Sequence, residues 1–489
     1  MKVSKLLLIG TVAAGALALH GCTEGDETSI TLTSNTTDDG GNDGSGGTSQ
    51  NCPAAFSTAR PQTADGMDVC ELNAFIQADA TLTNDIIWRL DGRVTVGNGD
   101  QELASATQLA SGDALLNVDL TIEAGTQIVG ADALVPTAFS NLVITRGSRI
   151  LANGTAAEPI VFSSEDDDLD GSQEWGGLII SGFAPHANCT GAVCNVDGEG
   201  NAGFIGGDDP TDDSGVLRYV ILAEGGEIIN NDGDEINGIS FNSVGSATTV
   251  EYIQVQGNAD DGVEFYGGTV NAKYVVLTAN QDDSLDWDEG FSGNIQYLLV
   301  VQADGTGDFC IEADTLGDST NPYSIPTIAN ATFVCSGDPE TVAFRMKEST
   351  GGFFHHTVVA TGGSPEGCFG IEDMGAQQNA TGDPIRLGIN QFICDATTFE
   401  YDEVNDTRQP SNFLQQAPVS TDDPQLDALY AAQSAAANGV TPTDFATFNT
   451  NFPESTAIPA FLDQTDYIGA VDPDATEAWW AGWTLDGTL

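Results

Sequence analysis

The residues best suited to chemistry are acidic, and the first group of them lies within residues 166–174. Its acids stand at positions 1, 3, 5 and 9 of this stretch: Asp166, Asp168, Asp170 and Glu174. Alternating carboxylates of this kind converge on one calcium ion in calcium-binding loops, where a glycine at position 6, here Gly171, permits a sharp turn. The bidentate acid expected at position 12 is missing, because residue 177 is glycine. The stretch is therefore either a calcium site or a solvated acidic loop.

Two Asp-Asp pairs form a second acidic group. Asp260-Asp261 and Asp282-Asp283 are 22 residues apart and begin similar segments, Asp-Asp-Gly-Val-Glu-Phe and Asp-Asp-Ser-Leu-Asp-Trp. If these segments stack in neighbouring coils, their carboxylates form a ladder spaced by about 4.8 Å, which is repulsive unless a cation or hydrogen-bond donors intervene. Calcium between the coils is one explanation. The other is that the aspartates accept hydrogen bonds from backbone amides of turns.

Three tyrosines recur at a similar spacing. Tyr252, Tyr274 and Tyr297 are 22 and 23 residues apart, each within an aliphatic run such as Val-Glu-Tyr-Ile-Gln-Val. Side chains alternate between the two faces of a strand. If the residue after each tyrosine lies in the core, the tyrosines themselves lie on the outer face and form an exposed strip. Such a strip either binds sugar rings by stacking or simply stabilises the stacked coils.

Basic residues are few. The chain has 13 Lys and Arg against 73 Asp and Glu, and its net charge of −60 excludes nucleic acid as a partner. A polysaccharide lyase would use calcium to neutralise a uronate and a Lys or Arg to remove the neighbouring proton. Lys347 and Arg345 are the candidates for that role. The neighbouring pair His355-His356 is expected to place one ring inside and one outside, because adjacent side chains in a strand point to opposite faces.

The N-terminus has the pattern of a lipoprotein signal. Two lysines precede an apolar run that is too short to span a membrane, and a small residue stands before Cys22. We expect residues 1–21 to be removed, Cys22 to carry lipid, and the protein to be anchored to the outer membrane and exposed on the cell surface. The alternative is cleavage near Ala18, which would release a soluble protein. Residues 22–51 are rich in Thr, Ser, Asn, Asp and Gly and are expected to form a flexible tether.

The other eight cysteines predict disulfides, as expected in an oxidising compartment. Their order suggests pairs of neighbours, although sequence alone does not determine connectivity. The suggested pairs are Cys52 with Cys70, Cys189 with Cys194, Cys310 with Cys335, and Cys368 with Cys394. A zinc site would need close clusters of Cys and His, which the sequence lacks.

Residues 52–394 repeat short β-branched and aliphatic runs separated by Gly, Asn and Asp. Two such runs in every 22 or 23 residues, as around the three tyrosines, is the period of a parallel β-helix rather than of a sandwich of hairpins. We therefore predict an all-β protein with a parallel β-helix over 52–394. Residues 395–489 break the repeat, and we expect them to cap the last coil, with a helix over 423–438.

Several blocks of the sequence resemble a known family. They are Leu120–Gly130 (Leu-Thr-Ile-x-x-Gly-Thr-x-Ile-x-Gly), Ala152–Phe162 (Ala-x-Gly-Thr-Ala-x-x-Pro-Ile-x-Phe) and Trp175-Gly176-Gly177. With these blocks the chain resembles the β-helical secreted and lipid-anchored proteins of Bacteroidota and marine Proteobacteria, over most of residues 85–485. The resemblance implies a right-handed parallel β-helix. It implies little about function, because no activity or ligand is established for that family.

Together these features favour a monomeric, non-catalytic lipoprotein that is stabilised by calcium and serves in surface binding or adhesion, with polysaccharide or a partner protein as its ligand. A calcium-dependent polysaccharide lyase is the first alternative. An accessory lipoprotein of an outer-membrane nutrient receptor is the second, and in that case the receptor is the partner.

Overall fold

The structure is a computed structural model, and the chain is described in twelve stretches. These are residues 47–131, 139–166, 169, 171–229, 235–316, 322–335, 342–361, 367–371, 387–394, 399–401, 413–415 and 460–489. The predicted signal, Cys22, most of the predicted tether and the helix expected over 423–438 lie outside these stretches. Within them, no helix has both the length and the apolar character needed to cross a membrane.

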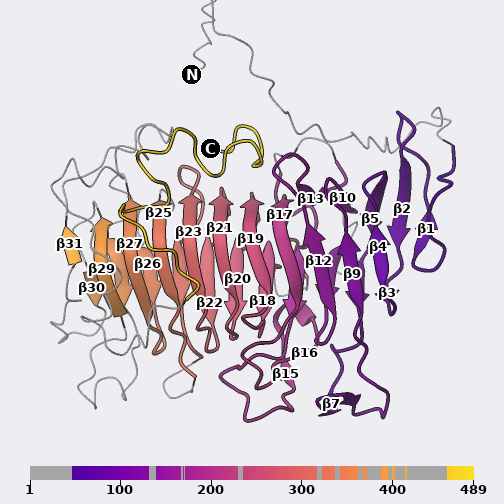
Figure 1. Ribbon diagram of the computed structural model, residues 1–489, viewed down its shortest axis with the longest axis horizontal. Helices are drawn as coiled ribbons and strands as arrows, with labels where there is room; N and C mark the ends of the chain where they lie inside the picture. Colours follow the sequence, from indigo (N-terminus) through magenta and orange to yellow (C-terminus); the bar gives the residue numbers. More distant parts are fainter. Residues whose placement is uncertain are drawn as a thin grey trace, which may run out of the picture.

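Most strands belong to two large sheets that run along the long axis of the molecule (Figure 1). The first sheet contains, in spatial order, β1 (Ser57–Ala59), β2 (Asp68–Leu72), β5 (Ile86–Leu90), β10 (Gln127–Gly130), β13 (Ile160–Ser164), β17 (Gly215–Ala223), β19 (Thr249–Gln256), β21 (Asn271–Thr278), β23 (Asn294–Val301), β25 (Thr327–Val334), β27 (Gly352–Ala360), β29 (Leu387–Cys394) and β31 (Phe413–Gln415). Beside this path lie β4 (Ala80–Leu82), β9 (Asp119–Ile122) and β12 (Arg149–Asn153).

The second sheet contains the other strand of each coil. In spatial order these are β3 (Phe75–Ile76), β6 (Arg93–Val96), β11 (Asn141–Ile144), β14 (Leu178–Ser181), β18 (Ile239–Asn242), β20 (Val263–Tyr266), β22 (Leu285–Asp288), β24 (Ile311–Ala313), β26 (Val342–Met346), β28 (Gly367–Ile371) and β30 (Phe399–Tyr401). Smaller elements are the strand pairs β7 (Leu103–Ser105) with β8 (Gln108–Leu109) and β15 (Val196–Asp197) with β16 (Phe204–Ile205), and a short 3-10 helix, η1 (Glu199–Asn201).

Successive strands of each sheet come from successive coils. In the first sheet Ile253 stands beside Val275, which stands beside Leu298. In the second sheet Phe265 stands beside Trp287. Pairing among the described strands is parallel except between β1 and β2 and within the two small pairs. The predicted parallel β-helix is therefore confirmed, and pairing continues through β30 and β31, beyond the boundary expected at residue 394.

Four disulfides join cysteines that are neighbours in the chain. The bonded pairs are Cys52–Cys70, Cys189–Cys194, Cys310–Cys335 and Cys368–Cys394, as the order of the cysteines suggested. The last two pairs lie in the buried core, each between a segment of the second sheet and the end of a strand of the first. They therefore join the two sheets from inside.

The long strands of the first sheet bend at one residue with left-handed backbone. This residue has a positive φ in six successive coils: Tyr219, Tyr252, Tyr274, Tyr297, Asn330 and His356. The bend interrupts the alternation of side chains, so that Val250 and Ile253, three residues apart, both face the core, while Glu251 and Tyr252 between them face outward. Left-handed backbone is unfavourable for a tyrosine, and the bend is stabilised by ring stacking between coils.

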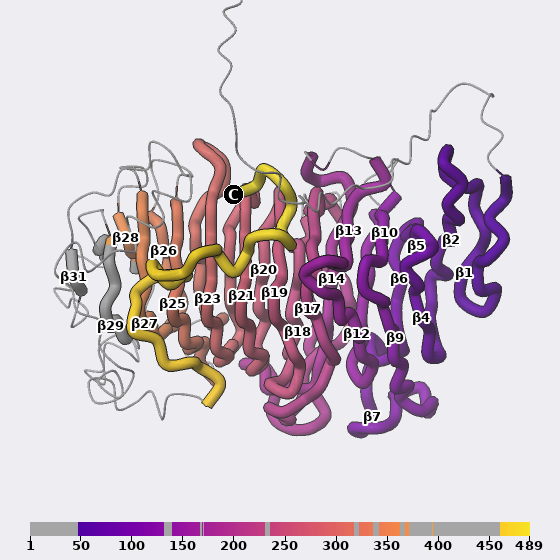
Figure 2. The backbone as a smooth tube through the Cα atoms, turned by 45° about the horizontal axis from the view of Figure 1, so that its top comes forward, coloured from indigo at the N-terminus to yellow at the C-terminus, as the bar shows by residue number. Residues whose placement is uncertain are grey.

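The outer face of the first sheet is apolar and is covered by the end of the chain. Figure 2 shows residues 460–489, in yellow, running along the flank of this sheet. Outward side chains such as Ile221, Val276 and Leu299 pack there against Trp480 and Trp483. The expectation that the C-terminal region caps the last coil is therefore wrong for residues 460–489. Strands that are apolar on both faces need cover on both faces, and this segment provides it.

We expect the Trp483→Ala variant to be strongly destabilised. The indole is 1% exposed and packs edge-on against the rings of Tyr219 and Tyr252, so its loss should lower the free energy of unfolding by about 3–5 kcal/mol. Chemical denaturation measures this. The control is Phe75→Ala, because Phe75 is 64% exposed and its removal should cost less than about 0.5 kcal/mol. Equal effects of the two substitutions would contradict the covering role of the segment.

Candidate functional site

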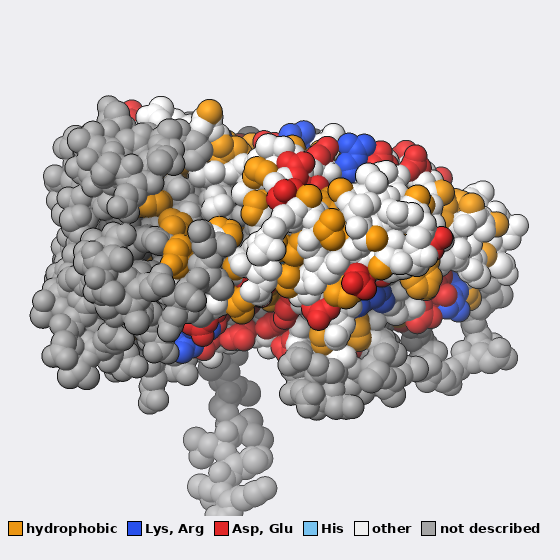
Figure 3. Space-filling model, turned by 90° about the horizontal axis from the view of Figure 1, so that it is seen from below, with side chains coloured by type: hydrophobic (Ala, Val, Ile, Leu, Met, Phe, Trp, Pro, Cys, Tyr) orange, Lys and Arg blue, Asp and Glu red, His pale blue; other side chains and the backbone are white. Residues whose placement is uncertain are grey.

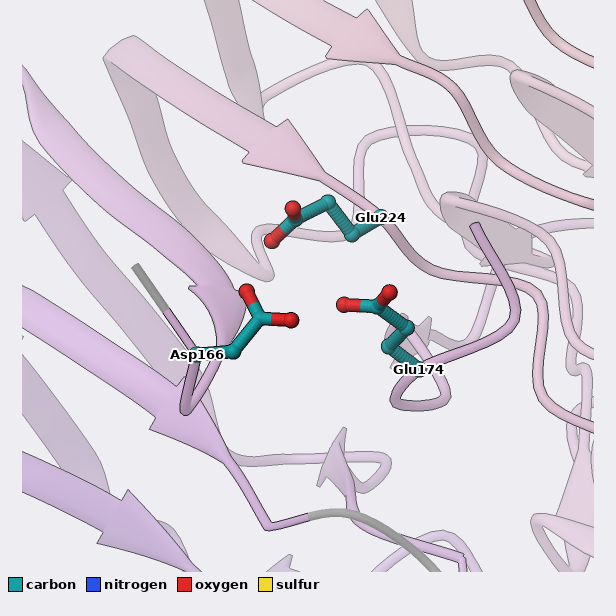
Figure 4. A group of neighbouring side chains, drawn as sticks. All are labelled: Asp166, Glu174 and Glu224. Carbon is teal, nitrogen blue, oxygen red and sulfur yellow. The ribbon is translucent and has the colours of Figure 1, made fainter. Parts of the chain in front are cut away.

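Two clusters of carboxylates are the candidate sites, and the first combines a loop with the following coil. Asp166 follows β13, Glu174 lies in the loop before β14, and Glu224 follows β17 with a left-handed φ of 65°. Figure 4 shows the three carboxylates pointing toward one another, and their ligand oxygens all lie within 4.8 Å of one another. We call Asp166, Glu174 and Glu224 the loop cluster.

The loop cluster is short of positive partners. Glu224 is buried and accepts hydrogen bonds from the amide and the hydroxyl of Ser164, at 3.2 and 3.0 Å. The same hydroxyl lies 2.9 Å from Asp166, but its single proton serves only one of the two carboxylates. Burial, together with the charges of Glu224 and Asp166, raises the pKa of Glu174 to about 7, although the hydrogen bond with Ser164 opposes this. A proton or a cation would relieve the repulsion.

The structure brings together only part of the predicted calcium loop. Asp166 and Glu174 meet as expected, while Asp168 and Asp170 lie outside the described residues. Glu224 was missed by the sequence reasoning. The loop lacks an acid at position 12, and the third carboxylate comes instead from the adjacent coil. The signal available in the sequence was an acid directly after an aliphatic strand run.

The second cluster lies on the outer face of the second sheet. Alternation along β20, β22 and β24 turns Glu264, Asp286 and Glu312 outward, and the register places Glu264 beside Asp286 and Asp286 beside Glu312. Asp261 and Asp283 lie in the turns that precede β20 and β22. We call these five residues the acidic row. In the space-filling view, acidic side chains gather in patches with the few Lys and Arg side chains beside them (Figure 3).

The two Asp-Asp pairs stack as predicted, and their inner members bond to the next coil. Asp261 Oδ1 accepts the amide of Asp283 at 2.9 Å, and Asp283 Oδ1 accepts the amide of Phe309 at 2.7 Å. These bonds support the explanation that the aspartates accept hydrogen bonds from backbone amides. They leave other carboxylate oxygens close together, because the groups Asp260–Asp261–Asp282, Asp261–Glu264–Asp286 and Asp283–Asp286–Glu312 each lie within 4.8 Å.

Burial and mutual repulsion disfavour the charged forms of these acids. Burial, with the charges of Glu199 and Asp282, raises the pKa of Asp260 to about 7. The pKa values of Asp261, Glu264, Asp283 and Asp286 are also raised well above their ordinary range, first by burial and then by neighbouring carboxylates. The sequence reasoning missed Glu264, Asp286 and Glu312, whose alternation with apolar residues in short strands was the available signal.

The two candidate catalytic bases stand at one end of the acidic row. Lys347 Nζ lies 2.7 Å from Glu312 Oε2 and 3.6 Å from Asp314 Oδ2, and Arg345 donates to Glu312 Oε1 at 2.9 Å. Burial opposes the charge of Lys347, but the hydrogen bond with Glu312 and the neighbouring acids outweigh it and raise the pKa of this lysine. Lys347 is therefore protonated at neutral pH.

The tyrosines form a stacked column, but not an exposed one. The ring centroids of Tyr252 and Tyr274 are 4.3 Å apart, and those of Tyr274 and Tyr297 are 4.7 Å apart. Trp483 packs on Tyr252 and Trp479 packs on Tyr274. The expected exposed strip is wrong, because residues 460–489 cover it.

The two adjacent histidines are both buried. His355 and His356 are each 0% exposed, so the expectation of one buried and one exposed ring is wrong. His356 is the left-handed residue of its coil, and its carbonyl accepts the amide of Gly469 in the C-terminal segment. The bend turns both residues outward, as it does Glu251 and Tyr252 in an earlier coil, and Thr465 of the C-terminal segment lies 3.1 Å from His356 Nδ1.

Comparison with known protein families gives a match over most of the chain. Residues 76–484, well over half of the chain, match the family described as the pectate-lyase like beta helix domain. The chain belongs to this family. Searches of curated proteins and of solved structures found no match. Membership of this pectate-lyase-like family agrees with the stacked parallel sheets, while the narrower resemblance to the secreted proteins of Bacteroidota and marine Proteobacteria stays a prediction.

The loop cluster predicts a pH-dependent stability in the presence of a chelator. A carboxyl whose pKa is higher in the folded than in the unfolded protein contributes stability fully below the unfolded value and loses it as pH rises through the folded value. Glu174 should therefore lose its contribution to stability as the pH rises from about 4.5 to about 7. We expect the melting temperature to fall less between pH 5 and pH 8 in Glu174→Gln than in the unchanged protein. Glu158→Gln, at an exposed position, is the control, and identical falls in all three proteins would contradict the prediction.

Proposed function

We propose that the protein is a lipoprotein of the outer membrane that is stabilised by calcium and binds polysaccharide at the cell surface without catalysing a reaction. Membership of the pectate-lyase-like family supports the class of ligand. The signal pattern before Cys22 supports the location. The long solenoid offers an extended surface, and with a net charge of −60 we expect acidic polysaccharide to bind through bridging calcium rather than directly.

The proposal that the protein catalyses no reaction rests on the protonation state of Lys347. A general base must be deprotonated near the working pH, whereas Glu312 and Asp314 raise the pKa of this lysine. Arg345 is paired with Glu312 as well. Both basic side chains act as counter-ions of the acidic row.

A calcium-dependent polysaccharide lyase is the second candidate, and one observation favours it. The outer face of the second sheet places acids that could hold calcium beside Lys347 and Arg345, in a fold of the pectate-lyase-like family. For catalysis, substrate or metal would have to replace Lys347 as the partner of Glu312. The accessory role beside an outer-membrane nutrient receptor stays a prediction from the sequence.

A binding screen separates the two candidates. The full chain is passed over immobilised acidic and neutral polysaccharides with calcium, and the ultraviolet absorbance of unsaturated uronates is followed in parallel. We expect retention on acidic polysaccharide without product. Product formation that disappears in Lys347→Ala would establish the lyase instead. The absence of both retention and product would contradict a polysaccharide ligand.

The loop cluster is expected to contribute to the stabilisation by calcium. A ligand that binds only the folded state raises the melting temperature, and Glu224→Gln removes one of three carboxylates that face one another. We therefore expect the rise in melting temperature on adding calcium to be smaller in Glu224→Gln than in the unchanged protein. Glu158→Gln serves as the control. A rise of the same size in both variants would exclude the loop cluster as a calcium site.

A further inference from the structure

Residues 460–489, which run along the first sheet in Figure 2, are bound there by buried side-chain amides. Gln296 makes two hydrogen bonds with the backbone of Asp463: its Oε1 accepts the amide at 2.8 Å, and its Nε2 donates to the carbonyl at 2.9 Å. Gln254 Oε1 accepts the amide of Leu485 at 2.8 Å. Both glutamines are buried. The outer face of the first sheet therefore binds the backbone of this segment as it would bind a peptide.

Strand β25 adds further hydrogen bonds to the segment. Asn330 Nδ2 donates to the carbonyls of Tyr467 and Gly469 at 3.2 and 3.4 Å. Thr332 Oγ1 accepts the amide of Ala470 at 2.9 Å. The partners in these bonds are 137 to 139 positions apart in the sequence. The contacts depend on the face and on the segment alone, so the same segment of another copy could make them equally well.

One ion pair between the face and the segment is specific for charge. Lys273 Nζ lies 2.7 Å from Asp463 Oδ2 and 4.8 Å from the ring centre of Phe461. Residues 460–489 contain several acids and no basic residue, so the charges of the face and the segment are complementary at this point. Reversal of one charge places like charges together, whereas reversal of both restores the attraction.

The length of chain before the segment does not require it to return to its own solenoid. Residues 416–459 separate β31 from the segment in the sequence, and a chain of this length can span up to about 140 Å. The effective concentration of a tethered group falls as its connection lengthens. A long connection therefore reduces the advantage of the chain's own segment over the segment of a neighbouring copy.

We propose that the outer face of the first sheet also binds residues 460–489 of a second copy, so that two copies join by reciprocal exchange of this segment. Exchange of an identical element needs no new interface, because each half of the pair repeats the contacts within one chain. The protein is mostly monomeric in dilute solution and exchanges segments at high local concentration. The inference adds a protein partner to the proposed surface role and does not depend on polysaccharide or calcium.

Charge reversal in the full chain tests the exchange. Lys273→Glu and Asp463→Lys each place like charges together within one chain, whereas a mixture of these two variants regains opposite charges at both faces by reciprocal exchange. The double variant, Lys273→Glu with Asp463→Lys, keeps opposite charges within one chain and is the matched control. Copies with different isotope labels are mixed at physiological salt, and native mass spectrometry counts the mixed dimers. We expect about tenfold more mixed dimer from the two single variants than from two labelled batches of the control.

Two results would overturn the exchange. One is a mixture of single variants with no more mixed dimer than the control. The other is a single variant that forms as much dimer by itself as the mixture does, because the association would then use another surface. Neither result affects retention on polysaccharide, so failure of this inference is distinguishable from failure of the proposed function.

A second measurement covers the case in which a single variant does not fold, which circular dichroism would show. The unchanged protein in two isotopic forms is mixed at rising concentration, with and without an excess of a synthetic peptide of residues 460–489. We expect mixed dimers that disappear when the peptide is added, because the peptide competes for the outer face of the first sheet. Dimers that resist the peptide, or the absence of dimers at every concentration, would overturn the proposal.

Discussion

Stacking of parallel coils places each side chain about 4.8 Å from its equivalents in the neighbouring coils, and the rest of the structure depends on which side chains tolerate this. Aromatic rings gain from it: inside the solenoid Phe265 stacks on its equivalent Phe241, with ring centroids 5.1 Å apart. Carboxylates do not, because each coil adds a like charge beside the previous one. The constraint that builds the core therefore also creates the acidic row, where Glu264 and Asp286 stand side by side.

The C-terminal segment follows from the same constraint. The bend at the tyrosine column turns two adjacent residues outward, and the strand beyond it places aliphatic side chains on the outer face as well. A ladder of exposed aliphatic residues along an open sheet would favour association with other chains. Residues 460–489 remove that hazard, and polar groups fix their position: Asp463 pairs with Lys273 at 2.7 Å, and Gln254 accepts the amide of Leu485 at 2.8 Å.

The features that the sequence predicted are those that depend on spacing. A period of about 22 residues was enough for the parallel β-helix, the tyrosine column and the stacked Asp-Asp pairs, because equivalent residues of neighbouring coils meet. The cover over the tyrosines was not predictable, since Lys273 and Asp463 are separated by 190 residues and the covering segment has no repeat. Glu224 was missed for a related reason: a loop that lacks one ligand does not show which coil supplies it.

The acidic row also shows why surface binding and lyase chemistry are close alternatives for this fold. Lys347 is held protonated because Glu312 and Asp314 are its partners. A cation bound by Glu312 would compete with Lys347 for the same carboxylate and would weaken the effect that raises the pKa of the lysine. Metal binding and the release of a base would thus be coupled through one side chain. A binding surface and a catalytic one would then differ in whether Glu312 pairs with lysine or with metal.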